Sequence, residues 1–509
     1  MKPSRRIGII DLGSNSARLI VVEYIPGWSF RIVDEVSQRV RLSDGMYKDG
    51  MLQPEAMRRA IETVKVFRSL CDASGAKEIV PIATAAVRDS RNQQVFLARL
   101  EEASRLKFQV LSGSEEANFS TLGAINGIGL TNGFVMDVGG GSTEISQVRI
   151  GHVPQSATTP LGALRLTEAF LSKRIDSHKG VFALRRYIHD VLQTLPWLQM
   201  PSEETAIVCG LGGTVRALVR IDREDQSYPL ELMNGYELPL RRIEKMIVRI
   251  TGLPVSERVR KIRGLQEDRA DIILAGAVTV AAILRHVGAN RIIVSGQGVR
   301  EGVFYSRFLP ASTGGVIPHL REFSVLNLVR IYGHHPTHSR QVARLALALF
   351  DQSSERHQFG ALEREYLWAA AQLHDVGTVI DYYDHPEHSA YIVLHSGLPG
   401  FTHRETALIA QLCLYHRKGR PGLKPYSDLF QPGDLARLRQ LTALLRIAEY
   451  LDRSRTQAVE SLELTFRNRH EAALRLRSRN GASAAIETWD AKRNLELFNE
   501  SFGCQLQII

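Results

Sequence analysis

The feature that most constrains this chain is a short sequence pattern that occurs twice, once near the start and once after residue 130. Each copy reads as an apolar strand, an aspartate, a Gly/Ser turn and a second apolar strand: IGIIDLGSNSARLIVV and GFVMDVGGGSTEISQV. Glycine lets backbone N–H groups approach a ligand closely, and several such donors together form a cradle for an anion. The aspartates, Asp11 and Asp137, indicate a divalent cation or an oriented water beside it. Either hairpin alone could be an ordinary tight turn, but two facing copies would hold a phosphate chain from both sides.

Length and cysteine content favour a multidomain protein of a reducing compartment. The chain has 509 residues, enough for about three or four domains. No apolar run reaches the roughly 18 residues of a membrane-spanning helix, and Asp11 interrupts the apolar stretch near the start, so neither a membrane span nor a signal peptide is expected. The cysteines stand singly, which favours reduced thiols and a cytoplasmic location: Cys71, Cys209, Cys413 and Cys504.

The charge balance is compatible with a polyanionic ligand. The formal net charge is +10, and a basic excess around phosphate-binding loops suits such a substrate. Nucleic acid is the competing explanation, but no basic run with interleaved aromatics and no zinc-finger or helix-turn-helix spacing is present. No specific nucleic-acid partner is therefore expected, and a mildly basic solvated surface explains the charge equally well.

The order of apolar and polar residues predicts an α/β protein with a helical region behind it. Strands alternate with amphipathic helices up to about residue 305, which indicates layered α/β lobes with a cleft between them. From about Arg321 the pattern is nearly continuous helix, and the last fifty or so residues return to short strands and one helix. The predicted domains are residues 1–128 (first lobe), 129–310 (second lobe), 311–456 (helical) and 457–509 (small α/β unit).

Six motifs appear in a fixed order: DLGSNSARL, ATAAVRD, SGSEEA, DVGGGSTE, GLGGT and SGQGVREGV. Together they resemble the exopolyphosphatase/guanosine pentaphosphate phosphohydrolase (Ppx/GppA) family of the actin-like superfamily. The resemblance implies two actin-like (ribonuclease-H-like) lobes around an interlobe cleft. It also implies hydrolysis of a terminal phosphoanhydride bond by an activated water, with Mg²⁺ as charge partner. Phosphoryl transfer of this kind depends on positioning and charge neutralisation more than on covalent help.

The resemblance also implies roles for particular residues. Glu116 matches the family's catalytic glutamate, which orients and deprotonates the attacking water, and its neighbour Glu115 is the alternative. Arg88, four residues after Thr84, can grip phosphate oxygens with two parallel hydrogen bonds. Viewed without the family, the Glu-Glu pair could simply be favourable charge at a helix N-terminus.

The remaining candidates lie on the glycine-rich loops. Asp137 and Glu144 are the expected Mg²⁺ ligands, with Asp11 helping from the first hairpin. Gly212 and Gly213 precede a helix, a pattern that presents N–H groups to an anion. The other expected phosphate-binding residues supply hydroxyl, amide or backbone N–H donors: Gly13, Ser14, Asn15, Ser16, Thr84, Gly139, Gly140, Gly141, Ser142 and Thr143.

The helical region contains a second group of candidate ligands. A histidine, a His-Asp doublet and a distant aspartate on separate helices resemble the ligand set of HD-type metal phosphohydrolases, and imidazole with carboxylate suits a divalent metal. His388 and His416 are candidates to extend the set. The alternatives are a buried polar scaffold that extends a substrate channel, or a dimer interface. The principal candidates are His338, His374, Asp375 and Asp452.

Three functions agree with these observations. The first is exopolyphosphatase action on inorganic polyphosphate, with hydrolysis of guanosine pentaphosphate (pppGpp) as its close alternative. The second is a kinase of the same superfamily, but such kinases place an aspartate as base for an acceptor hydroxyl, whereas SGSEEA offers glutamate. The third is a sensor that binds polyphosphate without turnover, which the presence of Glu116, Asp137 and Arg88 disfavours. A homodimer is the expected assembly.

Overall fold

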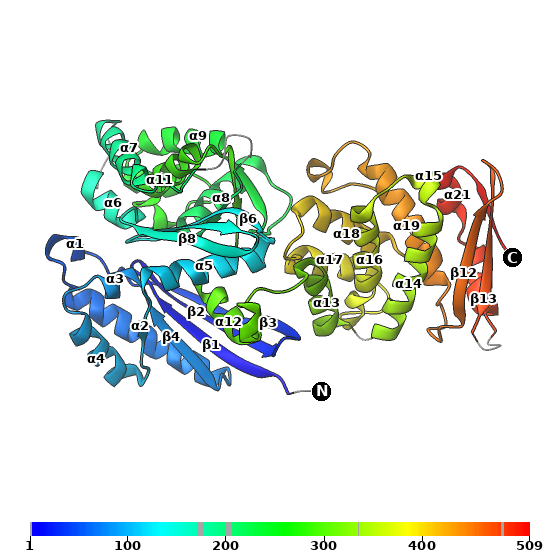
Figure 1. The fold of residues 1–509 in the computed structure, drawn as a ribbon, viewed down its shortest axis with the longest axis horizontal. Helices are drawn as coiled ribbons and strands as arrows, with labels where there is room; N and C mark the ends of the chain where they lie inside the picture. The colour runs from blue at the N-terminus through cyan, green and yellow to red at the C-terminus, as the bar shows by residue number, and fades with distance from the viewer. Residues whose placement is uncertain (1–2, 172–177, 200–205, 334, 480–482) are drawn as a thin grey trace. The chain divides into compact units, whose positions relative to one another are not determined.

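The structure is a computed structural model that describes residues 3–171, 178–199, 206–333, 335–479 and 483–509 (Figure 1). It divides into two compact units. The first contains residues 1–228 and 233–320, and the second contains residues 229–232 and 321–509. The first unit holds two β-sheets, and the second holds a helical region followed by a small sheet. The predicted fold, two α/β lobes followed by a helical region and a small α/β unit, is confirmed.

The first sheet has the strand order β3-β2-β1-β4-β5. Its first three strands form an antiparallel meander, and the last two run parallel to β1. The apolar run at the centre of β1 is buried, as expected for a strand covered on both faces. The elements are β1 (Arg5–Leu12), β2 (Ser16–Ile25), β3 (Ser29–Arg39), β4 (Glu78–Ala83) and β5 (Gln109–Val110), with helices α1 (Met46–Asp49), α2 (Pro54–Ala73), α3 (Ala85–Arg88) and α4 (Gln93–Ser104).

The second sheet has the strand order β10-β11-β9-β6-β7-β8. It again begins with an antiparallel hairpin, and β9 runs parallel to β6. Helix α11 is almost entirely apolar and buried, so it forms the centre of this lobe's core. The strands are β6 (Asn132–Val138), β7 (Thr143–Arg149), β8 (His152–Thr159), β9 (Val208–Leu211), β10 (Tyr236–Pro239) and β11 (Arg291–Val294), and the helices are α6 (Ala163–Phe170), α7 (His178–Gln193), α8 (Gly212–Gln226), α9 (Leu240–Thr251), α10 (Val255–Lys261) and α11 (Ile273–His286).

Two helices, α5 (Gly113–Ile128) and α12 (Val299–Phe308), cross closely within the first unit. A Cβ on Gly302 would lie 2.0 Å from the carbonyl oxygen of Phe119, so only glycine allows this approach. Helix α12 also packs against β1 and β2, where Phe304 meets Tyr24 edge to face. The chain therefore returns to the first sheet after completing the second (Figure 1).

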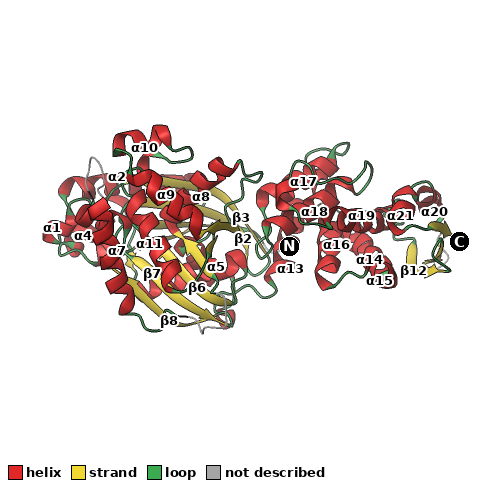
Figure 2. Cartoon of the chain, turned by 90° about the horizontal axis from the view of Figure 1, so that it is seen from above, coloured by secondary structure: helices red, strands yellow, loops and turns green. Residues whose placement is uncertain are grey.

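The second unit is a run of helices that ends in a three-stranded sheet of order β12-β13-β14 (Figure 2). In this sheet β13 pairs antiparallel with β12 and parallel with β14. The helices are α13 (Leu320–Tyr332), α14 (Pro336–Gln352), α15 (Ser354–His357), α16 (Ala361–Leu373), α17 (His385–Ser396), α18 (His403–Tyr415) and α19 (Asp434–Tyr450), and the terminal elements are β12 (Val459–Phe466), β13 (Glu471–Ser478), α20 (Ala485–Lys492), α21 (Glu496–Phe502) and β14 (Gln505–Ile508).

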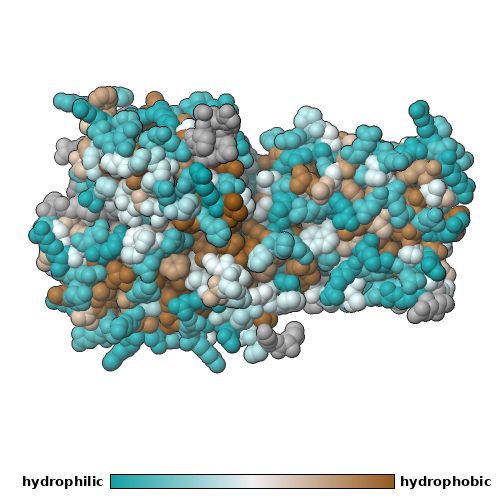
Figure 3. All heavy atoms as spheres, in the orientation of Figure 1, coloured by the Kyte–Doolittle hydropathy of each residue, from teal (hydrophilic) through white to brown (hydrophobic). Residues whose placement is uncertain are grey.

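The outer surface is mixed in polarity. On the face drawn in Figure 3, hydrophilic residues predominate and apolar residues are interspersed among them. Among the described residues, no helix combines the length and the apolar character needed to cross a bilayer.

Candidate active site

The two hairpins found in the sequence adopt the same local structure. In each, the first turn glycine donates its backbone N–H to the carbonyl oxygen of the serine that ends the turn: Gly13 to Ser16 over 3.1 Å and Gly139 to Ser142 over 3.0 Å. This bond holds the intervening residues in a tight loop at the strand ends. The predicted repeat is therefore a repeat of structure as well as of sequence.

The residue paired with the aspartate differs between the hairpins. Asp11 on β1 pairs across the ladder with Arg18 on β2. Asp137 on β6 pairs with Glu144 on β7. The first hairpin thus sets a guanidinium opposite its carboxylate, and the second sets two carboxylates side by side, an arrangement that suits a bound cation.

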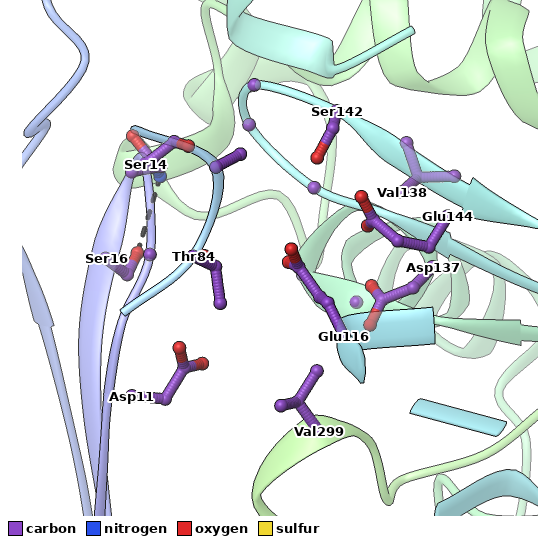
Figure 4. A pocket seen from close by; sticks show the side chains of 18 of the residues that line it. Asp11, Ser14, Ser16, Thr84, Glu116, Asp137, Val138, Ser142, Glu144 and Val299 are labelled. Atoms are coloured by element: carbon purple, nitrogen blue, oxygen red, sulfur yellow. Dashed lines mark hydrogen bonds between the residues drawn. The ribbon is translucent and has the colours of Figure 1, made fainter. Parts of the chain in front are cut away.

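Both turns line one cavity of the first unit (Figure 4). In Figure 4 the side chains of Glu116, Asp137 and Glu144 gather on one side, and Asp11 and Thr84 face them from the other. The lining is mostly polar and rich in glycine, which exposes backbone N–H groups. It comprises Asp11, Gly13, Ser14, Asn15, Ser16, Arg18, Thr84, Ala85, Glu116, Asp137, Val138, Gly139, Gly140, Gly141, Ser142, Glu144, Gly212, Gly213, Arg269 and Val299.

Glu116 enters this cavity from the first turn of α5. Ser112 caps the helix in a capping box, in which its hydroxyl accepts from the Glu115 backbone N–H and the Glu115 side chain accepts from the Ser112 N–H. Glu115 is thus used in the cap and does not line the cavity, whereas Glu116 is only 8% exposed. The helix start therefore separates the two adjacent glutamates into a structural one and one that faces the cavity.

Arg88, at the end of α3, contacts the cavity through Glu116. Its Nη1 donates to Glu116 Oε2 over 2.8 Å and to the Leu111 carbonyl oxygen over 3.0 Å. Thr84, at the start of the same short helix, lines the cavity directly. Thr143 lies next to the cavity, but its hydroxyl donates to the carbonyl oxygen of Leu161 and it is absent from the lining.

Burial of so many acids raises their pKa values. Burial raises the pKa of Glu116 from 4.5 to about 7, against the opposing effect of Arg88. It raises the pKa of Asp11 from 3.8 to about 6, although Arg18 opposes the change. Burial also raises the pKa values of Asp137 and Glu144, and for Glu144 the neighbouring Glu116 adds to the effect. Four acids with raised pKa values around one cavity indicate a place for a cation or a proton-transfer centre.

Two polar atoms of this cluster support the expectation of a divalent ion. Within the described residues, Asp11 Oδ1 and Glu144 Oε1 are buried without a hydrogen-bond partner. A buried carboxylate oxygen without a donor costs free energy, and hard divalent cations take such oxygens as ligands. Asp137 is partly satisfied, because its Oδ2 accepts from the Ser120 hydroxyl over 2.9 Å.

Sequence reasoning missed two cations of the cavity, Arg18 and Arg269. A signal for Arg18 was available, since the aligned repeats place it at the position of Glu144. Arg269 belongs to a short 3-10 helix at Glu267–Arg269. There its guanidinium packs against Gly213, where an added Cβ would lie 2.3 Å from Nη2. No local motif marks it, because only tertiary packing brings it to the cavity.

The cavity is thus lined by glycine-rich turns, guanidinium groups, clustered carboxylates and a buried glutamate, an arrangement that suits a phosphate chain and a general base. Such a site, on a two-lobed fold of this kind, is typical of enzymes that transfer or hydrolyse phosphoanhydrides.

Comparison with known proteins identifies the class. Residues 20–310 match the Ppx/GppA phosphatase family, and residues 320–495 match domain III of the Ppx/GppA phosphatases. The chain belongs to the Ppx/GppA phosphatase family and is a hydrolase of phosphoanhydride substrates.

Solved structures agree with this assignment. A Ppx/GppA family member from Aquifex aeolicus is 26% identical, with a TM-score of 0.51, and the match covers 60% of this chain and 98% of that one. An exopolyphosphatase from Cytophaga hutchinsonii has the same fold at 24% identity, with a TM-score of 0.55 and the same two coverages.

The helical candidates also come together, although with different partners from those expected. His338 and His374 lie 3.3 Å apart at Nε2, and Asp375 is beside them. Asp452 contacts Nδ1 of His338 over 2.8 Å instead of its Nε2. The carboxylate that faces both Nε2 atoms is Glu449, at 3.0 and 3.1 Å.

The histidine-rich stretch contributes a different residue from the one predicted. His385 is buried and lies 3.2 Å from His416, Nε2 to Nε2. His388, which the sequence analysis named as a candidate, is only partly buried.

Proposed function

We propose that this protein is an exopolyphosphatase that releases orthophosphate from the ends of inorganic polyphosphate chains. The observation that carries the proposal is the position of Glu116. It is a buried acid with a raised pKa, held by Arg88, in a cavity that two phosphate cradles line. A water between Glu116 and a terminal phosphate would lose its proton to the carboxylate as it attacks phosphorus.

The cradles would hold and orient the substrate. Backbone N–H groups of the glycine turns bind phosphate oxygens without bringing charge, so successive phosphates of a chain can occupy equivalent positions. Arg18 and Arg269 add positive charge at the lining, and Arg88 keeps Glu116 directed at the attacking water. Positioning and charge compensation of this kind account for most of the catalysis of phosphoryl transfer.

Asp137, Glu144 and Asp11 fit a magnesium ion. All three line the cavity. Asp11 and Glu144 each have a buried carboxylate oxygen without a hydrogen-bond partner among the described residues. When bound there, the ion supplies charge neutralisation for the phosphate oxygens. The same ion compensates the negative charge of these acids, whose pKa values are otherwise raised by burial.

The test is phosphate release from long polyphosphate, short polyphosphate, pppGpp and ATP, measured side by side with Mg²⁺. The proposal expects the highest kcat/KM on polyphosphate. A higher kcat/KM on pppGpp would make the pentaphosphate the main substrate while leaving the site assignment intact.

A kinase or a sensor would give a different result. Transfer of phosphate from ATP to an added hydroxyl acceptor, without phosphate release, would place the chain among the kinases of this fold. Tight polyphosphate binding with no release from any substrate would make it a sensor. The homodimer and the cytoplasmic location stay predictions.

A further inference from the structure

Four histidines of the second unit meet in its interior. They come from four separate segments: α14, the end of α16, the start of α17 and the end of α18. Each is at most 2% exposed, and none contributes to the cavity of the first unit. They are His338, His374, His385 and His416.

The hydrogen bonds of these histidines fix which ring nitrogen carries the proton. Three donate Nδ1–H to the backbone carbonyl oxygen three residues earlier, and a carbonyl oxygen can only accept. The fourth, His338, has its Nδ1 2.8 Å from Asp452 Oδ2, the carboxylate–histidine pairing that orients metal-bound imidazoles. The three backbone contacts are His374 to Ala371 at 2.8 Å, His385 to Tyr382 at 2.6 Å and His416 to Cys413 at 2.7 Å.

With Nδ1 occupied, Nε2 is the nitrogen of each ring that is left to bind a metal ion, and the Nε2 atoms face one another in pairs. Nε2 of His338 lies 3.3 Å from that of His374, and Nε2 of His385 lies 3.2 Å from that of His416. Two imidazole nitrogens at such a distance share either a proton or a cation. Ligand atoms at about 2.1 Å from one ion lie about 3 Å apart in neighbouring coordination positions, which is the spacing seen here.

A carboxylate completes each pair. Glu449 Oε2 lies 3.0 Å from Nε2 of His338 and 3.1 Å from Nε2 of His374. Asp375 Oδ1 lies 3.1 Å from Nε2 of His385 and 3.9 Å from Nε2 of His416.

An unsatisfied oxygen points to a missing partner in the second group. Asp375 is 5% exposed, and among the described residues its Oδ1 is buried without a hydrogen-bond partner of suitable geometry. Its Oδ2 is held by Arg455, whose Nη2 lies 2.7 Å away. The free oxygen is therefore fixed in place beside the Nε2 atoms of His385 and His374.

We propose that the second unit binds two divalent transition-metal ions. His338, His374 and Glu449 would hold one ion, and His385, His416 and Asp375 would hold the other. Asp375 Oδ1, 3.6 Å from Nε2 of His374, lies between the two groups. Imidazole-rich sites select transition metals such as Mn²⁺, Co²⁺ or Zn²⁺ over Mg²⁺, so the ions differ from the one expected in the carboxylate cluster of the first unit.

Asp452 acts on this centre as a positioning residue. It holds His338 in the tautomer that leaves Nε2 free, and its other oxygen accepts from the backbone N–H of Gln457 over 2.9 Å. It is not a metal ligand in this arrangement. The proposal is independent of the proposed function, since no residue of the first unit takes part.

The test is Co²⁺ binding by the full-length protein after metal removal with a chelator. To exclude binding in the first unit, the background protein carries Asp137→Asn and Glu144→Gln. After desalting, we expect mass spectrometry to find two Co²⁺ per chain. The protein should also show the visible absorption of Co²⁺ bound to nitrogen ligands. His416→Gln and Glu449→Gln should each lose one ion, and the exposed His395→Gln is the matched control that keeps both.

Other outcomes decide against the proposal. Retention of no Co²⁺ would overturn the site, and retention of one would overturn the two-ion arrangement. If the variants do not fold, the melting temperature of the otherwise unaltered protein decides, because an ion that binds only the folded state raises it. No rise with Co²⁺ or Mn²⁺ would leave the histidines as a buried polar scaffold.

Discussion

The raised pKa of Glu116 predicts that the metal-free first unit loses stability as the pH rises. Its folded pKa, about 7, lies above the ordinary value of 4.5. The carboxyl therefore contributes stability that is fully present below pH 4.5 and is lost as the pH rises through 7. Each pH unit between these values lowers the free energy of unfolding by about 1.4 kcal/mol. Ionisation of this acid alone therefore lowers it by about 3 kcal/mol by pH 8, with most of the loss between pH 5 and 7.

Glu116→Gln isolates this effect, because the amide does not titrate. The free energy of unfolding of the wild type should fall between pH 5 and 8 by about 2–3 kcal/mol more than that of the variant. Glu115→Gln, at the neighbouring, partly exposed position outside the cavity, should keep the wild-type pH dependence and is the matched control. Mg²⁺ should reduce the difference, because a bound cation stabilises the ionised carboxylates.

The measurement must report on the first unit alone. Cys209 lies buried in β9 of the second sheet, so its alkylation along a urea series, read by mass spectrometry, follows unfolding of that lobe. The fully unfolded protein at each pH gives the reference rate of labelling. Equal pH dependence for the wild type and Glu116→Gln would refute the reasoning, because it would show that burial does not raise the pKa of this acid.

Three further predictions concern activity. Glu116→Gln should lower kcat on polyphosphate by about 10²–10⁴-fold, the typical contribution of a positioned general base, while Glu115→Gln stays near wild type; the reverse result would assign the base to Glu115. Asp137→Asn should raise the Mg²⁺ concentration for half-maximal rate, because an amide is a poorer ligand for a hard cation, and an unchanged Mg²⁺ titration would remove Asp137 from the metal site. Gly162→Ala should raise the KM for polyphosphate, because the added Cβ would lie 2.2–2.5 Å from backbone atoms of the second glycine turn and displace it; an unchanged KM would show that the turn does not bind substrate.

Local sequence patterns predicted the parts of the fold that depend on local interactions. The hairpins could be predicted because their apolar runs, turns and aspartates are contiguous, and the start of α5 because Ser112 and Glu115 form a recognisable cap. Strand β3 was missed, since it is largely exposed and polar, so no buried face marks it in the sequence.

Residues brought together by tertiary packing were harder to predict. Arg269 reaches the cavity from a short 3-10 helix that carries no motif. Glu449 lies in the last turn of α19, three residues before Asp452 in the turn that follows the helix. From the sequence alone, either acid could be the one that faces the histidines. Only the three-dimensional arrangement shows that Glu449 faces the Nε2 atoms and Asp452 the opposite side of His338.

The pairing of Asp11 with Arg18, and of Asp137 with Glu144, gives the cavity a direction. Between two identical cradles, a phosphate chain could bind in either orientation with equal energy. Arg18 and Glu144 occupy equivalent positions in the two hairpins and carry opposite charges. This difference removes the symmetry between the two sides of the cavity. In the proposed complex with polyphosphate, a terminal phosphate, which carries more negative charge than an internal one, would favour the side where a cation can bind, and the guanidinium side would accommodate the phosphates behind it. A duplicated hairpin that differs at this position would thus be enough to distinguish the end of a polymer from its middle.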